Sequence, residues 1–222
     1  DPRDLTFEHL RALRRAGFNR VSMGVQDFNE QVQAAINRNQ SEAVTRQAIA
    51  WSRELGFASL NMDLIYGLPL QTVESFSATL DKVIAISPDR IAVYNFAYVP
   101  WMKPHQKLIL EEELPTPETK LNILTLTIRK LVEAGYVYIG MDHFAKADDE
   151  MAIAQRDGTL QRNFEGYSTK AGCDLFGLGM SAISHFGRNY AQNAKTLPEY
   201  CEAMRAGRFA AEVGYIMSTD DE

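Results

Sequence analysis

The amino-acid sequence predicts an α/β fold in which parallel strands form a partial (β/α) barrel with the helices outside. The first observation is a repeated junction, at which a helix ends in a glycine and a short strand follows, as at Gly17, Gly56 and Gly135. Such repeats are typical of αβ units, which build parallel sheets or barrels. The second observation is that polar and apolar residues alternate along the strands, whereas parallel strands covered on both faces are almost continuously apolar. Alternation favours a barrel with a polar interior.

Four helices are predicted from apolar residues at helical spacing and from residues that begin or end a helix. Thr116 and Pro117 are typical of the cap and the first position of a helix, and Gly135 is typical of its end. Ser41 and Gly56 bound an earlier helix in the same way. The predicted helices cover residues 5–16, 42–55, 73–86 and 117–134.

Three predicted strands, at residues 20–26, 59–65 and 137–142, each present one polar and one apolar face. A strand over residues 90–98 lacks a clean polar face. The polar faces consist of Ser22, Gly24 and Gln26, of Ser59, Asn61 and Asp63, and of Tyr138, Gly140 and Asp142. The opposite faces, which we expect to pack against the helices, include Val21, Met23, Leu60, Met62, Val137 and Ile139. If the first two polar faces coincide, their strands are parallel neighbours.

The regular alternation of helix and strand fades after about residue 145. We therefore expect residues 1–145 to form the later part of the barrel, and residues 146–222 to form barrel-closing and mouth segments that lead toward a further C-terminal domain. The sequence begins at Asp1 without a methionine and ends in an acidic stretch, so we expect an internal fragment of a longer protein.

Composition narrows the classes of function. The net charge of −6 and the lack of a Lys/Arg cluster argue against a nucleic-acid-binding protein. No apolar run approaches the ~20 residues that span a bilayer, and no signal sequence is evident, so we expect a cytoplasmic protein that does not enter a membrane. The two cysteines, Cys173 and Cys201, are far apart, which predicts reduced thiols and neither a disulfide framework nor a zinc site.

Two polar residues stand where an α/β barrel collects its active-site groups. Gln26 and Asp63 fall at or near the C-terminal ends of their predicted strands. Asp63 can accept hydrogen bonds from ribose hydroxyls or an ammonium group, and Gln26 can donate and accept at once. The alternative is that both are solvated strand ends.

Other candidate motifs are weaker. Residues 177–182 match the Gly-x-Gly-x-x-Ala dinucleotide fingerprint, but they stand late in the chain after a poor strand. Glycines that allow a close backbone approach are the favoured explanation. His143 beside Asp142 fits a hydrogen-bonded structural group better than a general base. Arg156 and Arg162 flank an aromatic loop and could bind carboxylates, with solvated surface arginines as an equal alternative.

Three motifs carry a family resemblance: Ser-Met-Gly-Val-Gln-Asp-Phe at 22–28, Asp-Leu-Ile-Tyr-Gly-Leu-Pro at 63–69, and the stretch from 138 to 169. In this order they resemble the oxygen-independent coproporphyrinogen III oxidases, which are radical S-adenosylmethionine enzymes of haem biosynthesis. The resemblance covers essentially the whole chain. It implies a partial barrel of the radical SAM type and the oxidative decarboxylation of two propionates of coproporphyrinogen III to give protoporphyrinogen IX. It also implies S-adenosyl-L-methionine and a 4Fe-4S cluster as cofactors, and an electron donor as a partner.

The resemblance further implies which residues bind the cofactor. Within matching motifs, positions that contact S-adenosylmethionine in the family fall on Gln26, Arg38, Asp63, Ala97 and Ile183. In the family these positions belong to the second of two S-adenosylmethionine molecules. Arg38 suits a carboxylate, because its planar guanidinium can grip both oxygens.

The Cys-x-x-x-Cys-x-x-Cys loop that holds the cluster in radical SAM enzymes is missing from the sequence. Three thiolates from such a loop leave one iron open to S-adenosylmethionine. We therefore expect this chain alone to hold no cluster and to be inactive.

Haem-chaperone relatives of the same superfamily, which bind haem without oxidising porphyrinogen, are the alternative. They carry a His-Asn pair followed closely by Tyr-Trp after the corresponding strand. Here residues 162–167 are Arg-Asn-Phe-Glu-Gly-Tyr, which favours the oxidase.

Overall fold

The computed structural model describes residues 1–164 and 166–218, so Glu165 in the stretch that favours the oxidase lies outside the described residues. The chain forms two compact units, Asp1–Leu160 (unit 1) and Gln161–Glu222 (unit 2). The division falls later than the expected boundary after residue 145. The reason is that α6 (Glu150–Arg156) belongs to unit 1. Arg90 at the start of β3 donates through Nε to both carboxylate oxygens of Asp149, the α6 cap, at 3.0 and 2.9 Å.

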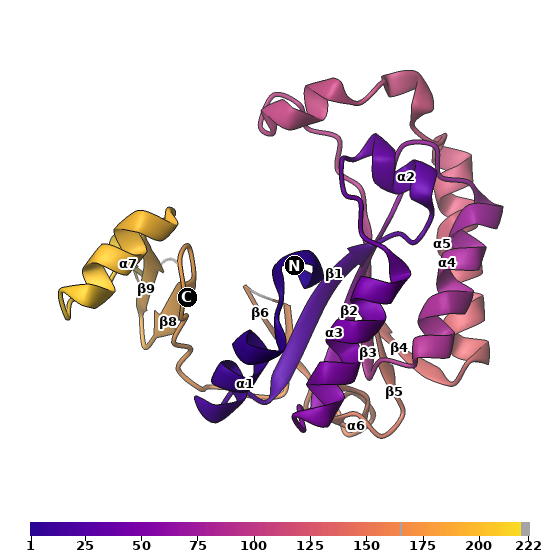
Figure 1. Ribbon diagram of the computed structural model, residues 1–222. Coiled ribbons are helices and arrows are strands. Elements are labelled where there is room, and N and C mark those ends of the chain that lie inside the picture. Colours follow the sequence, from indigo (N-terminus) through magenta and orange to yellow (C-terminus); the bar gives the residue numbers. More distant parts are fainter. Residues whose placement is uncertain (165, 219–222) are drawn as a thin grey trace. The chain divides into compact units, whose positions relative to one another are not determined.

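Unit 1 is built on a five-stranded sheet in the order β1-β2-β3-β5-β4 (Figure 1). The strands are β1 (Arg20–Gln26), β2 (Ser59–Tyr66), β3 (Arg90–Asn95), β4 (Tyr136–Gly140) and β5 (His143–Lys146). β1, β2 and β3 are parallel neighbours, and Ser22 lies opposite Asn61 in the register. This confirms the expected pairing of the first two polar faces. β5 is antiparallel to both of its neighbours, so the sheet is mixed and not parallel throughout.

The expected orientation of the last barrel strand is wrong. Tyr136 belongs to the core cluster on the helix-covered face, whereas Val137 and the buried Ile139 alternate with it and lie on the other face of β4. Tyr138 pairs with Phe144, a core residue of β5, and their rings lie 5.0 Å apart. β4 and β5 form a tight hairpin with an irregular register at its end, so the strand does not run on through Asp142 and its polar residues do not form an inner face.

Helices cover one face of this sheet (Figure 1). Four of them were predicted and are confirmed to within two residues at each end: α1 (Phe7–Arg15), α3 (Glu42–Glu54), α4 (Val73–Ile86) and α5 (Pro117–Glu133). The fifth, the short α2 (Glu30–Ala35), was not expected. Thr6, Ser41, Thr72 and Thr116 cap α1, α3, α4 and α5 by accepting a hydrogen bond from the backbone N–H three residues on.

The hydrophobic core lies between the sheet and these helices. Met23, Leu60 and Met62 belong to it and Val21 packs against it, as their strand positions predict. The helices contribute Ala48 and Ile49 from α3, Phe76, Leu80, Val83 and Ile86 from α4, and Ile123 and Leu131 from α5. Ser22, Asn61 and Asp63 alternate with these core residues along the strands, so they lie on the opposite face.

A buried carboxylate joins the loops at the C-terminal ends of β1 and β2. Asp27 follows β1 and is fully buried. Its Oδ1 accepts hydrogen bonds from Thr79 Oγ1 of α4 and from the Asn29 backbone N–H, and its Oδ2 accepts one from Gln71 Nε2 at 2.6 Å. Gln71 Oε1 in turn accepts from the Gly67 N–H at 2.6 Å. Burial raises the pKa of Asp27, and the hydrogen bonds from Thr79 and Gln71 oppose that rise.

Unit 2 contains a hairpin of β6 (Gln161–Asn163) and β7 (Gly166–Ser168), a three-stranded antiparallel sheet and a helix. The sheet has the order β10-β9-β8, with β8 (Ile183–Phe186), β9 (Asn189–Asn193) and β10 (Ala211–Ile216), and the helix is α7 (Leu197–Arg205). The glycine-rich segment 177–182 leads into a strand, not a helix, which removes the dinucleotide-fingerprint context. A Cβ on Gly177 would lie 2.6 Å from the Ile183 carbonyl oxygen, so this glycine permits a close backbone approach.

In the part of the chain that the structure describes, no helix has both the length and the apolar character needed to cross a bilayer.

Replacing Asp27 with Asn should destabilise the chain by about 1–3 kcal/mol, although the side chains have the same shape. Every described contact of the carboxylate is with a donor, so an Asn amide would set its NH2 against either Gln71 Nε2 or the Asn29 N–H. Gln71 cannot simply turn over, because its oxygen is bound to Gly67. Urea denaturation measures the loss, with Asp148→Asn at an exposed position as the control. Equal stabilities for the two variants would contradict this account of the network.

Candidate functional site

Three polar side chains form a hydrogen-bonded cluster on the sheet face away from the helices. Asp63 Oδ2 accepts from Ser22 Oγ at 3.0 Å, and Asp63 Oδ1 accepts from Asn61 Nδ2 at 2.7 Å. The second amide hydrogen of Asn61 goes to Ser22 Oγ at 2.9 Å. The three residues hold one another in place, and each carboxylate oxygen of Asp63 keeps a lone pair for a further donor.

Gln26 lies beside this cluster because the end of β1 is irregular. The register of β1 against β2 shifts between Gly24 and Gln26, and Gln26 has a φ of 68°. A non-glycine residue in the left-handed region is uncommon and is typical of a bulge or a functional site. Here it lets the Gln26 amide fold back over Gly24, where an added Cβ would lie 2.6 Å from Gln26 Nε2.

Arg38 reaches the same glycine from the loop after α2. Its Nη2 donates to the Gly24 carbonyl oxygen at 2.8 Å, and its Nη1 forms an ion pair with Asp1 Oδ2 at 3.2 Å. Its side chain is 19% exposed. Burial, followed by the nearby charge of Arg3, lowers the pKa of Arg38 from its ordinary value, although a guanidinium stays charged at neutral pH. Its buried Nε has no hydrogen-bond partner among the described residues.

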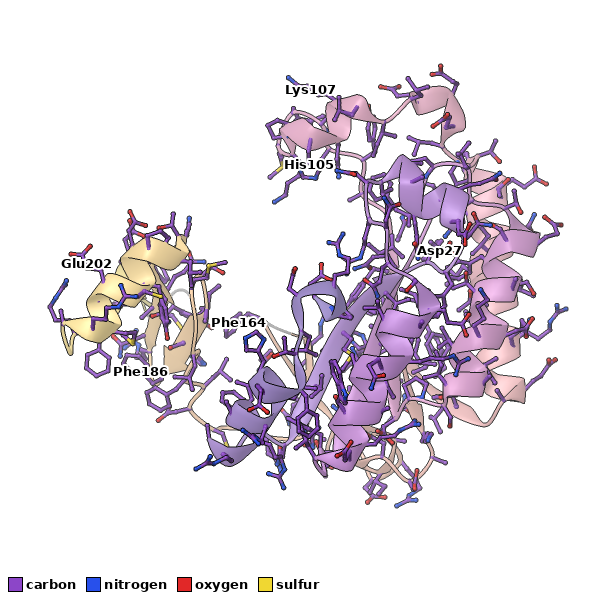
Figure 2. The ribbon with its side chains drawn as sticks, viewed as in Figure 1. Asp27, His105, Lys107, Phe164, Phe186 and Glu202 are labelled. Atoms are coloured by element: carbon purple, nitrogen blue, oxygen red, sulfur yellow. The ribbon has the colours of Figure 1, made fainter. Side chains whose placement is uncertain are left out.

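Ala97 follows β3 at the same edge of the sheet, and its position is fixed by a residue that the sequence did not single out. Gln106 in η2 (Pro104–Leu108) donates through Nε2 to the Ala97 carbonyl oxygen at 3.1 Å and accepts from the Val99 N–H at 2.6 Å. Gln106 is buried, whereas its neighbours His105 and Lys107 are exposed (Figure 2). The buried Gln106 side chain therefore fixes the backbone of the loop after β3.

Tyr94 adds a phenol to the polar face. Burial raises the pKa of Tyr94, and the carboxylates of Asp63 and Asp142 raise it further. The ring also meets His143 edge-on, with the centroids 6.0 Å apart. The phenol therefore stays protonated at neutral pH and can serve as a donor near Asp63.

Ile183 belongs to unit 2, where it lines an apolar hollow of about 300 Å³. Aromatic residues form much of its wall, and Phe164 packs edge-on against Tyr190 at 5.4 Å. The structure thus brings Gln26, Arg38 and Asp63 together around Gly24, with Ala97 at the same sheet edge. The place of Ile183 among them stays a prediction.

The residues around Gly24 fit S-adenosyl-L-methionine. Arg38 retains unused donors for a carboxylate, including its orphaned Nε, and Asp63 has lone pairs for hydroxyl or ammonium hydrogens.

The described residues do not fit a 4Fe-4S cluster. Within residues 1–164 and 166–218, no group of three or more His, Cys, Asp or Glu side chains could hold a metal ion. The exposed Cys173 and the half-buried Cys201 are both in unit 2.

Comparison with known proteins places the chain in a family. Residues 1–83 match the family model of the Radical SAM superfamily. The chain is 53% identical over 214 residues to the oxygen-independent coproporphyrinogen III oxidase of Synechocystis, covering 96% of this chain and 46% of that protein. The oxidase of Thermostichus vulcanus is 50% identical over 221 residues, covering 99% of this chain and 68% of that protein.

A solved structure agrees. The coproporphyrinogen III oxidase of Escherichia coli, a radical SAM enzyme, is 49% identical and superposes with a TM-score of 0.87, covering 100% of this chain and 51% of that one. This confirms the predicted fold class. The chain spans about half the length of most of the curated relatives it matches. It belongs to the family of oxygen-independent coproporphyrinogen III oxidases.

Proposed function

We propose that this chain forms the cofactor-binding part of a coproporphyrinogen III oxidase that converts two propionates to vinyl groups and yields protoporphyrinogen IX. The observation that supports this most directly is the convergence of Gln26, Arg38 and Asp63 around Gly24 at the C-terminal edge of parallel strands. Active-site groups of α/β barrels gather at this edge. The names of the relatives supply the substrate.

Each residue has a distinct part in binding S-adenosyl-L-methionine. Arg38 grips the carboxylate of the methionine moiety, because a guanidinium matches a carboxylate with two parallel hydrogen bonds. Asp63, oriented by Ser22 and Asn61, accepts hydrogen bonds from ribose hydroxyls or the ammonium group. Gln26 supplies one donor and one acceptor beside them, and Ala97 lies at the same edge of the sheet. A contact from Ile183 rests on the family resemblance alone.

When bound and reductively cleaved, S-adenosyl-L-methionine supplies a 5′-deoxyadenosyl radical that takes a hydrogen atom from the β-carbon of a propionate. The substrate radical left by hydrogen abstraction would lose carbon dioxide and pass one electron to an electron acceptor as the vinyl group forms. The chain's own contribution is to hold the reacting groups at one place and to exclude water from them.

The partners follow from this chemistry. Coproporphyrinogen III is the substrate, and an electron donor supplies the reducing electron. A cytoplasmic location and the absence of membrane partners stay predictions. The absence of a nucleic-acid partner is also a prediction, supported by the net charge of −6 and the lack of a basic cluster.

Arg38→Ala and Asp63→Ala should each weaken S-adenosylmethionine binding by about 1.5–3 kcal/mol, the usual contribution of a charge-assisted hydrogen bond. Both side chains point away from the core, so the fold should survive. Isothermal titration calorimetry and thermal denaturation measure the two effects. The matched controls are Arg46→Ala on α3 and Asp81→Ala on α4, which remove exposed ion pairs elsewhere in unit 1. Unchanged affinity in both folded site variants would show that the cofactor binds elsewhere.

Gly24→Ala should reduce cofactor binding without unfolding the chain. The added Cβ would lie 2.6 Å from Gln26 Nε2 and 3.3 Å from Arg38 Nη2, so both side chains must move. Gly214→Ala is the matched control, because this strand glycine has only an ordinary contact of 3.7 Å at the same position. We expect at least about a tenfold loss of affinity for Gly24→Ala, which corresponds to the loss of one charge-assisted contact. Equal affinities for the two variants would contradict the assigned geometry.

A chimera tests the activity. This chain replaces the matching 46% of the Synechocystis oxidase, and the purified chimera is assayed anaerobically with coproporphyrinogen III, S-adenosylmethionine and a reductant. We expect protoporphyrinogen IX and two molecules of carbon dioxide per substrate, and no turnover with Asp63→Ala. The unfused chain, which has no three-cysteine loop, should retain no stoichiometric iron after reconstitution. A folded, iron-loaded chimera that binds one haem tightly and turns over no porphyrinogen would favour a haem chaperone.

A further inference from the structure

The side-chain amide of Gln33 closes the loop that carries Arg38. Gln33 is at the C-terminal end of α2 and is only 6% exposed. Its Nε2 donates to the Gln40 carbonyl oxygen at 2.7 Å, and its Oε1 accepts from the Gln40 N–H at 2.9 Å. This two-point pairing copies a backbone pair of a β-sheet and joins the two ends of the segment that contains Arg38.

The closed loop is anchored to β1 and to α3. Gln33 Nε2 also donates to the Asp27 carbonyl oxygen at 2.8 Å, which ties the loop to the end of β1. Gln40 donates through Nε2 to Thr45 Oγ1 of α3 at 2.9 Å and to the Gly24 carbonyl oxygen at 3.3 Å. The Arg38 N–H donates to the Gln33 carbonyl oxygen at 2.8 Å. The Arg38 backbone is therefore held by the closed loop, and its guanidinium is held by Gly24, to which Gln40 of the same loop is also bonded.

Holding the Arg38 guanidinium in place before a ligand arrives would lower the entropy cost of binding that ligand. A free arginine side chain has many rotamers, and a ligand that binds it would otherwise have to remove this conformational entropy. The side-chain amide of Gln33 is buried behind the loop, and among the described residues its hydrogen bonds go to backbone atoms of Asp27 and Gln40. An effect of Gln33 on a ligand at the polar face must therefore act through the Arg38 loop or through the end of β1 at Asp27, and a double-mutant cycle with Arg38 separates the two routes.

We propose that Gln33 is a positioning residue that holds the Arg38 guanidinium against the Gly24 carbonyl, in the place where it meets a ligand carboxylate. The ligand part of this inference rests on the proposed function, with S-adenosylmethionine as the ligand. The positioning of Arg38 does not depend on it.

The first experiment measures Arg38 directly in the full chain, without any cofactor. Phenylglyoxal modifies exposed guanidinium groups, and peptide mass spectrometry reports the rate at each arginine. Gln33→Met should raise the rate at Arg38 by about fivefold, the population change expected when one hydrogen bond of ordinary strength is lost. Gln71→Met is the matched control, because Gln71 is also buried and bound to Asp27 but makes no described bond to the Arg38 loop. Gln33→Glu, which keeps the acceptor for Gln40, replaces Gln33→Met if that variant fails to fold.

An Arg38 rate that rises equally in the Gln33 and Gln71 variants would reduce Gln33 to a general stabilising residue. An unchanged rate in the folded Gln33 variant would overturn the inference outright.

The second experiment is a double-mutant cycle on S-adenosylmethionine affinity. Gln33→Met should weaken binding by about 5–10-fold when Arg38 is present, and by less than about twofold in the Arg38→Ala background. Equal losses in both backgrounds would mean that Gln33 does not act through Arg38. If Arg38→Ala alone leaves the affinity unchanged, the proposed cofactor site fails, whereas the phenylglyoxal result still decides the positioning role.

Discussion

The geometry of unit 1 depends on the buried carboxylate of Asp27. A charge in the protein interior is tolerated only when donors surround it. Here the donors come from the backbone after β1, from the loop after β2 and from α4. Two strand ends and a helix are therefore held in a fixed relation at the edge of the sheet where Gln26 and Asp63 lie. Removing any donor leaves part of the charge unpaired, which is why this network constrains the fold more strongly than an apolar contact of similar size.

Two consecutive residues at the end of β1 lie in opposite environments, one on the polar face and one in the interior. Gln26 faces the polar side of the sheet, and Asp27 immediately after it is buried among helices α2 and α4 (Figure 2). The left-handed conformation of Gln26 makes this change of direction possible, at a cost of order 1–3 kcal/mol for a strained residue. The hydrogen bonds of Asp27 offset that cost. A bulge next to a candidate site is a recurrent way to re-aim one side chain.

Gly24 is the centre of the site because it lacks a side chain. Its carbonyl accepts from Arg38 and from Gln40, and the space above it admits the Gln26 amide. The neighbouring strand contributes Asp63, whose orientation is set by Ser22 and Asn61. Three segments, 22–26, 38–40 and 61–63, thus supply one set of donors and acceptors, and the match to coproporphyrinogen III oxidases gives this set a chemical context.

The sequence by itself determined the four longest helices of unit 1, the parallel pairing of β1 with β2 and the polar face that carries Gln26 and Asp63. These features depend on local periodicity and caps, which a linear sequence contains. Arg38, Ala97 and Ile183 came from family resemblance, not from any local pattern. Only the tertiary structure decided the inverted face of β4, because a hairpin register depends on its turn and partner strand. It also decided the roles of Asp27, Gln33 and Gln106. Asp27 is joined to partners 44 and 52 residues away, and no periodicity in the sequence encodes which buried donor will meet which acceptor.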